Sequence, residues 1–566
     1  MAQPQPSTPS PASDAGRLGR DLLILLLLAG LLFGLRLGTA PLANPDEGRY
    51  AEIPREMLAR SDWVTPQLNG VNYFEKPPLV YWATAVSLKT FGPTEWAVRA
   101  VPAFFALLGL LTTYGATRRL YGPAAALAAA IVLATSLLYF ALARIVLLDM
   151  AVSVLMSGAL FCFILGVREP AGTRRRLLFY ALYACMALAT LTKGLMGVLV
   201  TGAVMFLWLL IFNQWRRLRP MYLPTGVLLF LALAAPWHVL AAMRNPTWVH
   251  RYLVYEHWER FTTPAAGRPG AWWYFVPVLI AGLYPWTGFI PNALREALRG
   301  GWAARKRNAE AWFFIVWAVF IFLFFSASHS KLITYILPVF PALAVLIGAR
   351  LAGMWQGRKR ELAAGLLIFT IFSVLLAIAL VLAVVKPDLL GLLPPPAPLR
   401  LYAFALAGLA LAGGALAHHF ALVRGARVAL STVGLTAIAF YATLTLIVGD
   451  IQRPGTKELA LLVREKAKPG DRVVHYHEFF HDFTFYAARP VDVVSGKGEL
   501  ELEEDAAARA GDRFCDDAEF RRRWTGPARL WVVARKGAAL ELFADPAFRH
   551  YVIAESANHV LFSNQP

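Results

Sequence analysis

Residues 21–38 read DLLILLLLAGLLFGLRLG, an apolar run whose only charged residues are Asp21 and Arg36. A run of this length predicts a helix that crosses the hydrocarbon core of a membrane. A signal peptide would end at a small-residue cleavage site after a shorter apolar core, so we expect an uncleaved first helix. Residues 1–20 before it are rich in Pro and Ser, and we expect them to be disordered.

Twelve further apolar runs follow the first one. Over all 566 residues, 58% are hydrophobic and only 16% are charged, whereas soluble proteins are about one quarter charged. The sequence therefore predicts an α-helical polytopic membrane protein with about 13 transmembrane helices. The predicted spans lie near residues 21–38, 96–117, 124–142, 150–167, 178–191, 195–213, 223–243, 273–292, 311–328, 333–350, 362–385, 401–421 and 429–448.

The net charge of +19 would by itself suggest nucleic-acid binding, but its distribution argues against that function. From Asp450 onward the net charge is −2, so the whole excess lies in residues 1–449. Nucleic acids bind basic residues clustered on an exposed face, and the apolar runs leave little such face. The Lys and Arg residues instead collect in alternate short loops, which the positive-inside rule places in the cytoplasm. We therefore predict a cytoplasmic N-terminus and, after an odd number of spans, an outer C-terminal region.

Residues 450–566 have a different character from the rest of the chain. Short alternating stretches at 472–477, 529–534 and 550–554 predict strands, and charged stretches at 457–468 and 499–509 predict helices. We predict a small α/β domain here. The predicted domains are a disordered terminus (1–20), a membrane domain (21–449) with outer loops at 39–95 and 244–272, and the α/β domain (450–566).

The first outer loop, residues 39–95, holds seven of the 17 acidic residues found before Asp450. Glu52, Glu56 and Arg60 share one face of a predicted helix whose opposite face is apolar, as in a helix that lies in the membrane interface. A solvated loop with charged helices is the alternative interpretation.

Two clusters in this loop combine opposite charges with residues that restrict or free the backbone. The first contains Asp46, Glu47 and Arg49, and suits metal coordination, general-base work or an ion pair; Gly48 lets the backbone approach another group closely. The second is Glu75-Lys76 before two prolines. Here the Glu could bind a metal or a sugar hydroxyl, and the Lys a phosphate.

Further charged residues lie near the ends of predicted spans. Asp149 opens the fourth span and must pair, with Arg144 as one candidate, or face a cavity, because an unpaired carboxylate in lipid is costly. Lys193 and Lys331 could be snorkelling anchors or part of a site. The second outer loop, 244–272, carries more carboxylates, Arg and His than a simple loop requires.

The clusters at one membrane edge suit a lipid-linked phosphosugar reaction. Arg binds phosphate oxygens bidentately and Lys supplies a point charge. Aromatic side chains around them, notably Tyr50, Tyr73 and Tyr81, could stack on sugar rings or flank a lipid chain.

Four segments resemble the signatures of bacterial polyprenyl-phosphate-sugar-dependent glycosyltransferases. These are NPDEGRY (44–50), YFEKPP (73–78), LTKG (191–194) and SKLITYILP (330–338). The family belongs to the GT-C superfamily, with protein O-mannosyltransferases as relatives, and the narrowest resemblance is to transferases that add aminoarabinose to lipid A. It implies a GT-C fold over the whole chain, a bacterial inner-membrane location, and a periplasmic active site and C-terminal domain.

The resemblance also implies a reaction and its partners. The donor would be 4-amino-4-deoxy-L-arabinose on undecaprenyl phosphate and the acceptor a lipid A phosphate, within the lipids of the inner membrane; the modification gives resistance to polymyxin-type peptides. No nucleotide or redox cofactor and no nucleic acid is expected. A divalent metal is possible, with Glu75 and His257 as its ligands, although two ligands are too few to identify a metal.

The resemblance assigns roles to the charged and aromatic residues. Asp46 or Asp149 would orient or activate the acceptor. Glu47, which follows Asp46, is the third predicted catalytic residue. Arg49, Lys76, Arg260, Lys193 and Tyr335 would hold the donor phosphate and stabilise the charge that develops on it. The residues that contact substrate would be Tyr50, Tyr73, Tyr81 and Lys331.

Two other functions remain open from the sequence. The same fold and donor could serve a protein or another glycan as acceptor, as in the protein O-mannosyltransferases. A lipid-linked-sugar flippase is a different class, but transporters usually place polar groups along a path at mid-membrane and show repeated halves. The three cysteines, Cys162, Cys185 and Cys515, indicate no disulfide framework.

Overall fold

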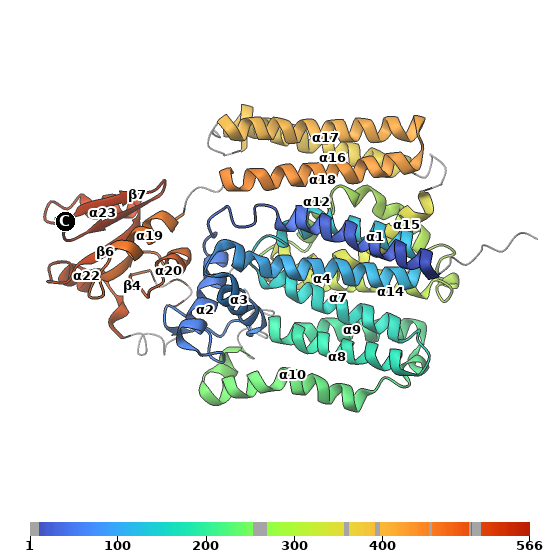
Figure 1. Ribbon diagram of the computed structural model, residues 1–566, viewed down its shortest axis with the longest axis horizontal. Coiled ribbons are helices and arrows are strands. Elements are labelled where there is room, and N and C mark those ends of the chain that lie inside the picture. Colours follow the sequence, from blue (N-terminus) through green and yellow to red (C-terminus); the bar gives the residue numbers. More distant parts are fainter. Residues whose placement is uncertain are drawn as a thin grey trace, which may run out of the picture.

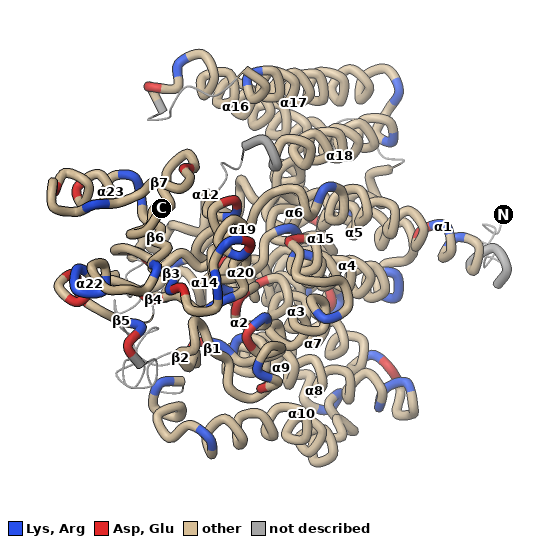
Figure 2. Tube along the Cα trace, turned by 60° about the vertical axis from the view of Figure 1, so that its left-hand side comes forward, with Lys and Arg blue, Asp and Glu red and all other residues tan. Residues whose placement is uncertain are grey.

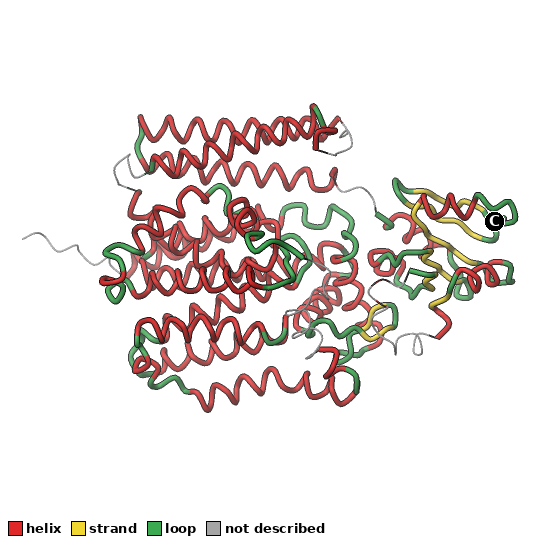
Figure 3. The backbone as a smooth tube through the Cα atoms, turned by 180° about the vertical axis from the view of Figure 1, so that it is seen from behind, coloured by secondary structure: helices red, strands yellow, loops and turns green. Residues whose placement is uncertain are grey.

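A long helical bundle and a smaller sheet-containing domain make up the protein (Figure 1). The computed structural model describes residues 11–252, 269–355, 362–390, 397–451, 455–496, 498, 500 and 511–566. Most helices of the bundle run side by side along one direction, and the C-terminal domain lies beyond one end of them (Figure 1). The view from behind shows the same division, with the larger sheet in that domain and a short two-stranded hairpin near the end of the bundle (Figure 3).

Most helices of the bundle follow the predicted spans, but α1 begins at Pro11, so the prediction of disorder is wrong for residues 11–20, which continue the first helix toward the N-terminus. Eight helical segments in the described residues are long and apolar enough to cross a membrane. They are Glu95–Tyr121, Leu148–Gly166, Leu223–Arg244, Ala309–Ala327, Ile333–Met354, Ala363–Val385, Ala397–Val423 and Ala426–Ile447. The helices before Asp450 are α1 (Pro11–Ala29), α2 (Asp46–Arg60), α3 (Leu79–Phe91), α4 (Glu95–Tyr121), α5 (Pro123–Ala134), α6 (Leu137–Leu142), α7 (Leu148–Gly166), α8 (Thr173–Lys193), α9 (Met196–Phe212), α10 (Leu223–Arg244), α12 (Phe275–Gly282), α13 (Ile290–Ala297), α14 (Ala309–Ala327), α15 (Phe340–Met354), α16 (Ala363–Val385), α17 (Ala397–Val423) and α18 (Ala426–Ile451).

Two of the predicted spans are interrupted. The span near 124–142 is divided into α5 and α6 at Thr135 and Ser136, whose hydroxyls donate to carbonyls of the preceding turn. The indole of Trp286 also donates to the Thr135 hydroxyl, at 2.8 Å. The span near 273–292 is divided by a 3₁₀ turn that follows Pro285, because proline supplies no N–H for a continuing helix.

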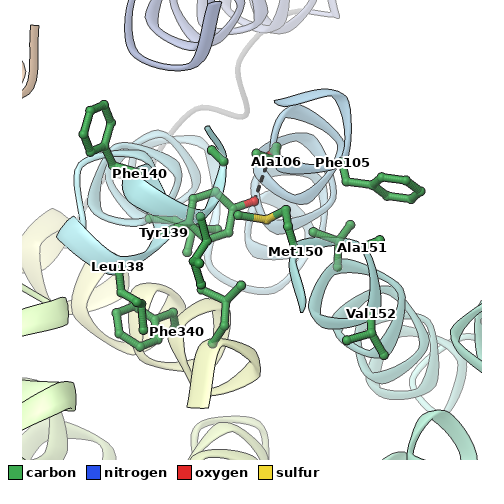
Figure 4. Packing of buried hydrophobic residues seen from close by; sticks show 14 of the residues in the cluster. Phe105, Ala106, Leu138, Tyr139, Phe140, Met150, Ala151, Val152 and Phe340 are labelled. Atoms are coloured by element: carbon green, nitrogen blue, oxygen red, sulfur yellow. Dashed lines mark hydrogen bonds between the residues drawn. The ribbon is translucent and has the colours of Figure 1, made fainter. Parts of the chain in front are cut away.

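The interior of the bundle is packed with apolar and aromatic side chains (Figure 4). Tyr139 is fully buried and donates its hydroxyl to the carbonyl of Ala106, at 2.7 Å. A Cβ on Gly109 would lie 2.2 Å from that hydroxyl, so this glycine lets α4 approach the tyrosine. This hydrogen bond satisfies the buried hydroxyl of Tyr139, so the hydroxyl needs no water partner inside the core.

The first outer loop folds into compact structure at the end of the bundle. Helices α2 and α3 lie there between the bundle and the C-terminal domain (Figure 1). A short antiparallel hairpin, β1 (Gln67–Leu68) and β2 (Val71–Asn72), follows α2. Its turn residues Asn69 and Gly70 both have positive φ, which is the conformation that an Asn-Gly hairpin turn requires.

The C-terminal domain contains a six-stranded sheet of order β5-β4-β3-β6-β8-β7. Strands β5, β4, β3 and β6 run parallel, and β8 and β7 add an antiparallel edge. The predicted strands coincide with β3, β6 and β7 and the first predicted helix with α19, whereas residues 501–509 of the second predicted helix lie outside the described residues. The elements are α19 (Lys457–Lys466), β3 (Arg472–Tyr476), α20 (His481–Ala487), β4 (Asp492–Val494), β5 (Phe514–Cys515), α22 (Asp517–Trp524), β6 (Leu530–Arg535), α23 (Lys536–Phe543), β7 (Tyr551–Glu555) and β8 (His559–Ser563).

Charged residues lie mainly at the ends of the bundle and on the C-terminal domain (Figure 2). The long helical stretches between them are almost free of Lys, Arg, Asp and Glu in the described part of the chain (Figure 2). At the end of the bundle that carries α2, charged side chains such as Glu47, Arg49 and Arg99 are buried, and these buried charges identify the candidate site.

Candidate active site

Helix α2 begins directly after Pro45 and carries Asp46 and Glu47 in its first turn. Carboxylates are favoured there because the helix dipole places partial positive charge at the N-terminus. The two neighbours nevertheless have different surroundings. The Asp46 side chain is 49% exposed, whereas that of Glu47 is 4% exposed.

Glu47 is held by hydrogen bonds on both carboxylate oxygens. Arg99 of α4 donates two of them, at 2.9 and 2.7 Å, and the backbone N–H groups of Ala43 and Val146 donate two more. Arg99 also donates to the carbonyls of the loop before α2. Both oxygens of Glu47 are occupied in this way, so Glu47 orients the start of α2, and its catalytic role stays a prediction.

Asp46 forms the charged pair that remains accessible. It accepts a hydrogen bond from Arg49, whose side chain is only 6% exposed. The Arg49 guanidinium lies over the ring of Tyr50, at 4.9 Å, and 6.0 Å from the ring of Tyr73. Aromatic faces stabilise a desolvated cation at such distances. The structure therefore brings together four of the predicted residues from two motifs.

Tyr50 lies at the centre of this group of charges. Its ring is buried and lies 6.1 Å from that of Tyr81. Burial raises the pKa of the Tyr50 hydroxyl above its ordinary value, Arg49 lowers it, and the carboxylates of Asp46, Glu75 and Asp149 raise it further. All three carboxylates therefore act electrostatically on one side chain, so the first outer loop and the start of α7 converge.

Asp149 pairs with Lys193, at 2.6 Å, and not with Arg144. Arg144 instead donates to the carbonyls of residues 32 and 35, which corrects the pairing considered from the sequence. Lys193 ends α8 and lies 4.8 Å from the centroid of the Tyr335 ring. Two predicted phosphate-binding residues and one predicted catalytic carboxylate thus form one cluster.

The Glu75-Lys76 segment contributes a second cation on the same loop. The Lys76 ammonium donates to the carbonyl of Glu75, at 2.8 Å, and lies 3.9 Å from its carboxylate. Both side chains are partly exposed. Phe74 beside them packs into an aromatic cluster with Trp237, Trp248 and Tyr252, which anchors the segment.

Lys331 has a different role from the predicted one. Its ammonium donates to the carbonyls of Ser326 and Ser328, at 2.8 and 2.7 Å, and is buried. It therefore satisfies carbonyls at the C-terminal end of α14, where a cation is favoured. The substrate contact of Lys331 stays a prediction, because its ammonium already bonds to these carbonyls in the structure.

The charged face of α2 is also different from the predicted one. Glu52 and Glu56 are buried, and only Arg60 of the three is exposed. Glu52 pairs with Arg55, at 2.6 Å, and Glu56 accepts from the backbone N–H groups of the β1–β2 turn. Helix α2 is thus enclosed by protein, and the interfacial position predicted for its charged stripe is wrong.

Arg260 and His257 lie outside the described residues. In the part of the chain that the structure describes, no three His, Cys, Asp or Glu side chains are grouped so as to hold a metal ion. The metal pair Glu75 and His257 and the phosphate role of Arg260 stay predictions.

Sequence reasoning missed two residues that organise the site. Arg99 lies inside a predicted span, and a charge within a span is itself a signal of a structural or functional role. Asn44, which precedes the acidic pair, bonds to the C-terminal domain, and no sequence signal points to that distant partner.

A family model described as dolichyl-phosphate-mannose-protein mannosyltransferase matches residues 75–239. The undecaprenyl phosphate-alpha-4-amino-4-deoxy-L-arabinose arabinosyl transferase of Pectobacterium carotovorum is 35% identical over 344 residues, which is 60% of this chain and 61% of that relative. A transferase of the same name from Sodalis glossinidius is 36% identical over 59% of this chain and 60% of its own length. The matched region thus spans about three fifths of these curated relatives.

The similarity to a solved structure extends over nearly the whole chain. The crystal structure of ArnT from Cupriavidus metallidurans bound to undecaprenyl phosphate is 30% identical, covers 96% of this chain and 97% of its own, and superposes with a TM-score of 0.84. The apo state of the same protein gives a TM-score of 0.82. With this identity over almost the full length, the chain belongs to the ArnT family of membrane glycosyltransferases with the GT-C fold.

Proposed function

We propose that the protein transfers 4-amino-4-deoxy-L-arabinose from undecaprenyl phosphate to a phosphate of lipid A on the periplasmic face of the inner membrane. One observation carries this proposal. Two charged pairs, Asp46–Arg49 and Asp149–Lys193, lie at one end of the membrane bundle in a chain that superposes on an undecaprenyl-phosphate-bound ArnT over nearly its full length.

The reaction exchanges one phosphate ester at the sugar for another. The bond between sugar C1 and the undecaprenyl phosphate oxygen breaks, and its electron pair leaves with that phosphate. An oxygen of the lipid A phosphate forms the new bond to C1. The acceptor is already anionic, so no base has to remove a proton before attack.

The chain's contribution is then to position both phosphates and stabilise the departing charge. Lys193, with Tyr335 beside it, and Lys76 supply point charges for the leaving phosphate. Arg49 offers the planar fork that suits a phosphate. The partly exposed Asp46 is placed to orient the acceptor, while Asp149 fixes the ammonium of Lys193.

The membrane orientation is part of the same proposal. Arg118 and Arg119 end α4, whose first residue, Glu95, pairs with Lys457 of the C-terminal domain. Arg216 and Arg217 follow α9, which begins just after Lys193 at the end of α8. Both arginine pairs therefore lie at the ends of these helices that are opposite the candidate site. The positive-inside rule assigns these arginines to the cytoplasm, which puts α2 and the C-terminal domain in the periplasm. Alkaline phosphatase fused after Pro566 is expected to be active.

Mass spectrometry of lipid A tests the reaction. We expect the chain to add aminoarabinose to lipid A when expressed in a polymyxin-sensitive Gram-negative strain that makes the donor but lacks its own transferase. Asp149→Asn should lower the modified fraction by about a hundredfold, because the misplaced Lys193 ammonium would no longer meet the leaving phosphate. Asp388→Asn, an exposed carboxylate after α16, is the matched control and should be active.

The outcomes separate the possible acceptors. Unmodified lipid A at normal membrane levels of the chain would contradict the proposal, and the sugar on a protein or another glycan would indicate the protein O-mannosyltransferase-like alternative. The named relatives are transferases, so they do not favour a flippase. A divalent metal bound by Glu75 and His257 stays a prediction.

A further inference from the structure

The motif that begins α2 is bonded to the C-terminal domain through Asn44. The side-chain amide of Asn44 donates to Oδ1 of Asp482, and the backbone N–H of Asp482 donates back to Oδ1 of Asn44, at 3.0 Å. Asp482 is the second residue of α20. Residues 438 positions apart thus form a reciprocal two-bond contact beside Asp46.

Asp482 is fully buried, so its carboxylate depends on the hydrogen bonds around it. Its second oxygen, Oδ2, accepts from the backbone N–H of Thr456, at 3.1 Å. Burial raises the pKa of Asp482, whereas the bonds from Thr456 and Asn44 lower it. One carboxylate therefore joins the first outer loop, the start of the C-terminal domain and α20.

Helices α2 and α20 touch directly at this point. A Cβ on Gly48 would lie 2.4 Å from the backbone nitrogen of Asp482, which is closer than any side chain tolerates. Gly48 lies between Asp46 and Arg49, the two members of the accessible charged pair. The contact therefore fixes the turn of α2 that carries this pair.

His481, the first residue of α20, lies within the electrostatic influence of Arg49. The imidazole is buried, and burial together with the charge of Arg49 lowers the pKa of His481 to about 3. The ring therefore stays neutral beside the guanidinium at physiological pH. It also packs edge-on against Phe479, with ring centroids 4.7 Å apart.

We infer that Asp482 is a positioning residue of the active site, through which the C-terminal domain sets the orientation of the Asp46–Arg49 pair. The inference rests on the proposed transferase function and adds a role for the C-terminal domain. Asp482 acts through Asn44 and the start of α2 and does not touch substrate.

Other contacts hold the same domain and offer a matched control. The side chain of Asn69 donates to the carbonyl of Val491 and accepts from its N–H, both at 2.9 Å. Like the Asn44–Asp482 contact, this is an asparagine with two bonds across the domain junction. It lies in the β1–β2 turn, however, and not beside the charged pair.

An exchange of the two side chains tests the inference. Asp482→Asn places a side-chain amide opposite the amide of Asn44. Asn44→Asp places a carboxylate opposite the carboxylate of Asp482. The double variant Asn44→Asp with Asp482→Asn restores a donor opposite each acceptor and keeps an acceptor for Thr456. We expect each single variant to lower kcat for transfer by about tenfold, with little change in the KM for the donor lipid, and the double variant to recover most of that rate.

Amide hydrogen exchange of residues 46–50 in the full-length protein provides a readout that needs no activity. Both single variants should exchange faster there, and the double variant should regain protection. Wild-type protein that does not modify lipid A would contradict the proposed function but leave this comparison valid. Single variants with wild-type kcat and protection, or a double variant without recovery, would overturn the inference.

The Asn69 variant distinguishes a positioning role of Asp482 from a general role in holding the C-terminal domain against the bundle. Asn69→Gly should retain most of the wild-type kcat, because it removes a domain contact in the β1–β2 turn and keeps the positive φ of that turn. If Asn69→Gly reduced kcat as strongly as Asp482→Asn, the C-terminal domain would act only by staying attached, and the positioning role of Asp482 would be wrong.

Discussion

Adjacent residues Asp46 and Glu47 show how environment separates two carboxylates with the same chemistry. Glu47 is buried and forms a two-bond ion pair with Arg99. The side chain of Asp46 is half exposed and pairs with Arg49. Removing one partner of a buried pair leaves an uncompensated charge and costs about 3–5 kcal/mol. The partner of Asp46, Arg49, is also buried, but it has a second source of stabilisation in the rings of Tyr50 and Tyr73.

We therefore expect the two matched substitutions to fail in different ways. Glu47→Gln should lower the apparent Tm of the detergent-solubilised protein, because Arg99 loses its charged partner in the bundle. Asp46→Asn should lower the Tm less than Glu47→Gln does, because the rings of Tyr50 and Tyr73 still stabilise the Arg49 cation, and it should lower the rate of sugar transfer. Thermal unfolding and lipid A mass spectrometry on both variants check this. A stable but inactive Glu47→Gln would show that Glu47 takes part in the reaction directly.

At the scale of the element, α2 is a helix whose charges point into protein. Glu52 is fully buried, and burial raises its pKa from 4.5 to about 8, with Arg55 opposing the shift. A group with a raised folded-state pKa contributes stability below its unfolded pKa and loses it as pH rises through the folded pKa. The ionisation of Glu52 should therefore destabilise the protein between about pH 4.5 and pH 8.

Glu52→Gln should remove this component of the pH dependence. We expect the fall in Tm between the acidic and alkaline ends of that window to be smaller in the variant than in the wild type. Glu458→Gln, at the start of α19 in the C-terminal domain, is the control and should follow the wild-type curve. Equal pH slopes for Glu52→Gln and wild type would mean that Glu52 is ionised in the folded protein throughout.

At the scale of the whole molecule, the closest approach of α2 to α20 occurs at Gly48, in the junction between the two domains. Gly48→Ala should lower the Tm by several degrees, because the new Cβ would meet the backbone of Asp482 at 2.4 Å. The gain in helix propensity from alanine is small in comparison. Gly115→Ala in α4, where the Cβ has no heavy atom within 4 Å, is the control.

Differential scanning fluorimetry of the two glycine variants measures this difference. Gly115→Ala should match or slightly exceed the wild-type Tm. If Gly48→Ala were equally stable, the domains would tolerate a displacement at their junction, and the close approach of α2 to α20 would not determine their placement.

The membrane class, the approximate positions of the spans and the C-terminal α/β domain could all be predicted from the sequence. Apolar runs and alternating strands are local patterns, and each reports directly on the solvent that a segment must face. The motifs NPDEGRY and YFEKPP also identified Asp46, Arg49, Glu75 and Lys76 as unusual, because charge beside a membrane span is costly without a purpose.

Only the tertiary structure decided which of these charges remain available. The pairing of Asp149 with Lys193, the burial of Glu47 by Arg99 and the Asn44–Asp482 contact join residues 44, 52 and 438 positions apart. Long-range pairing of this kind leaves no periodic trace in a single sequence, since it depends on how whole helices and domains pack. The sequence by itself determined where charges occur, and packing determined which of them stay open to a substrate.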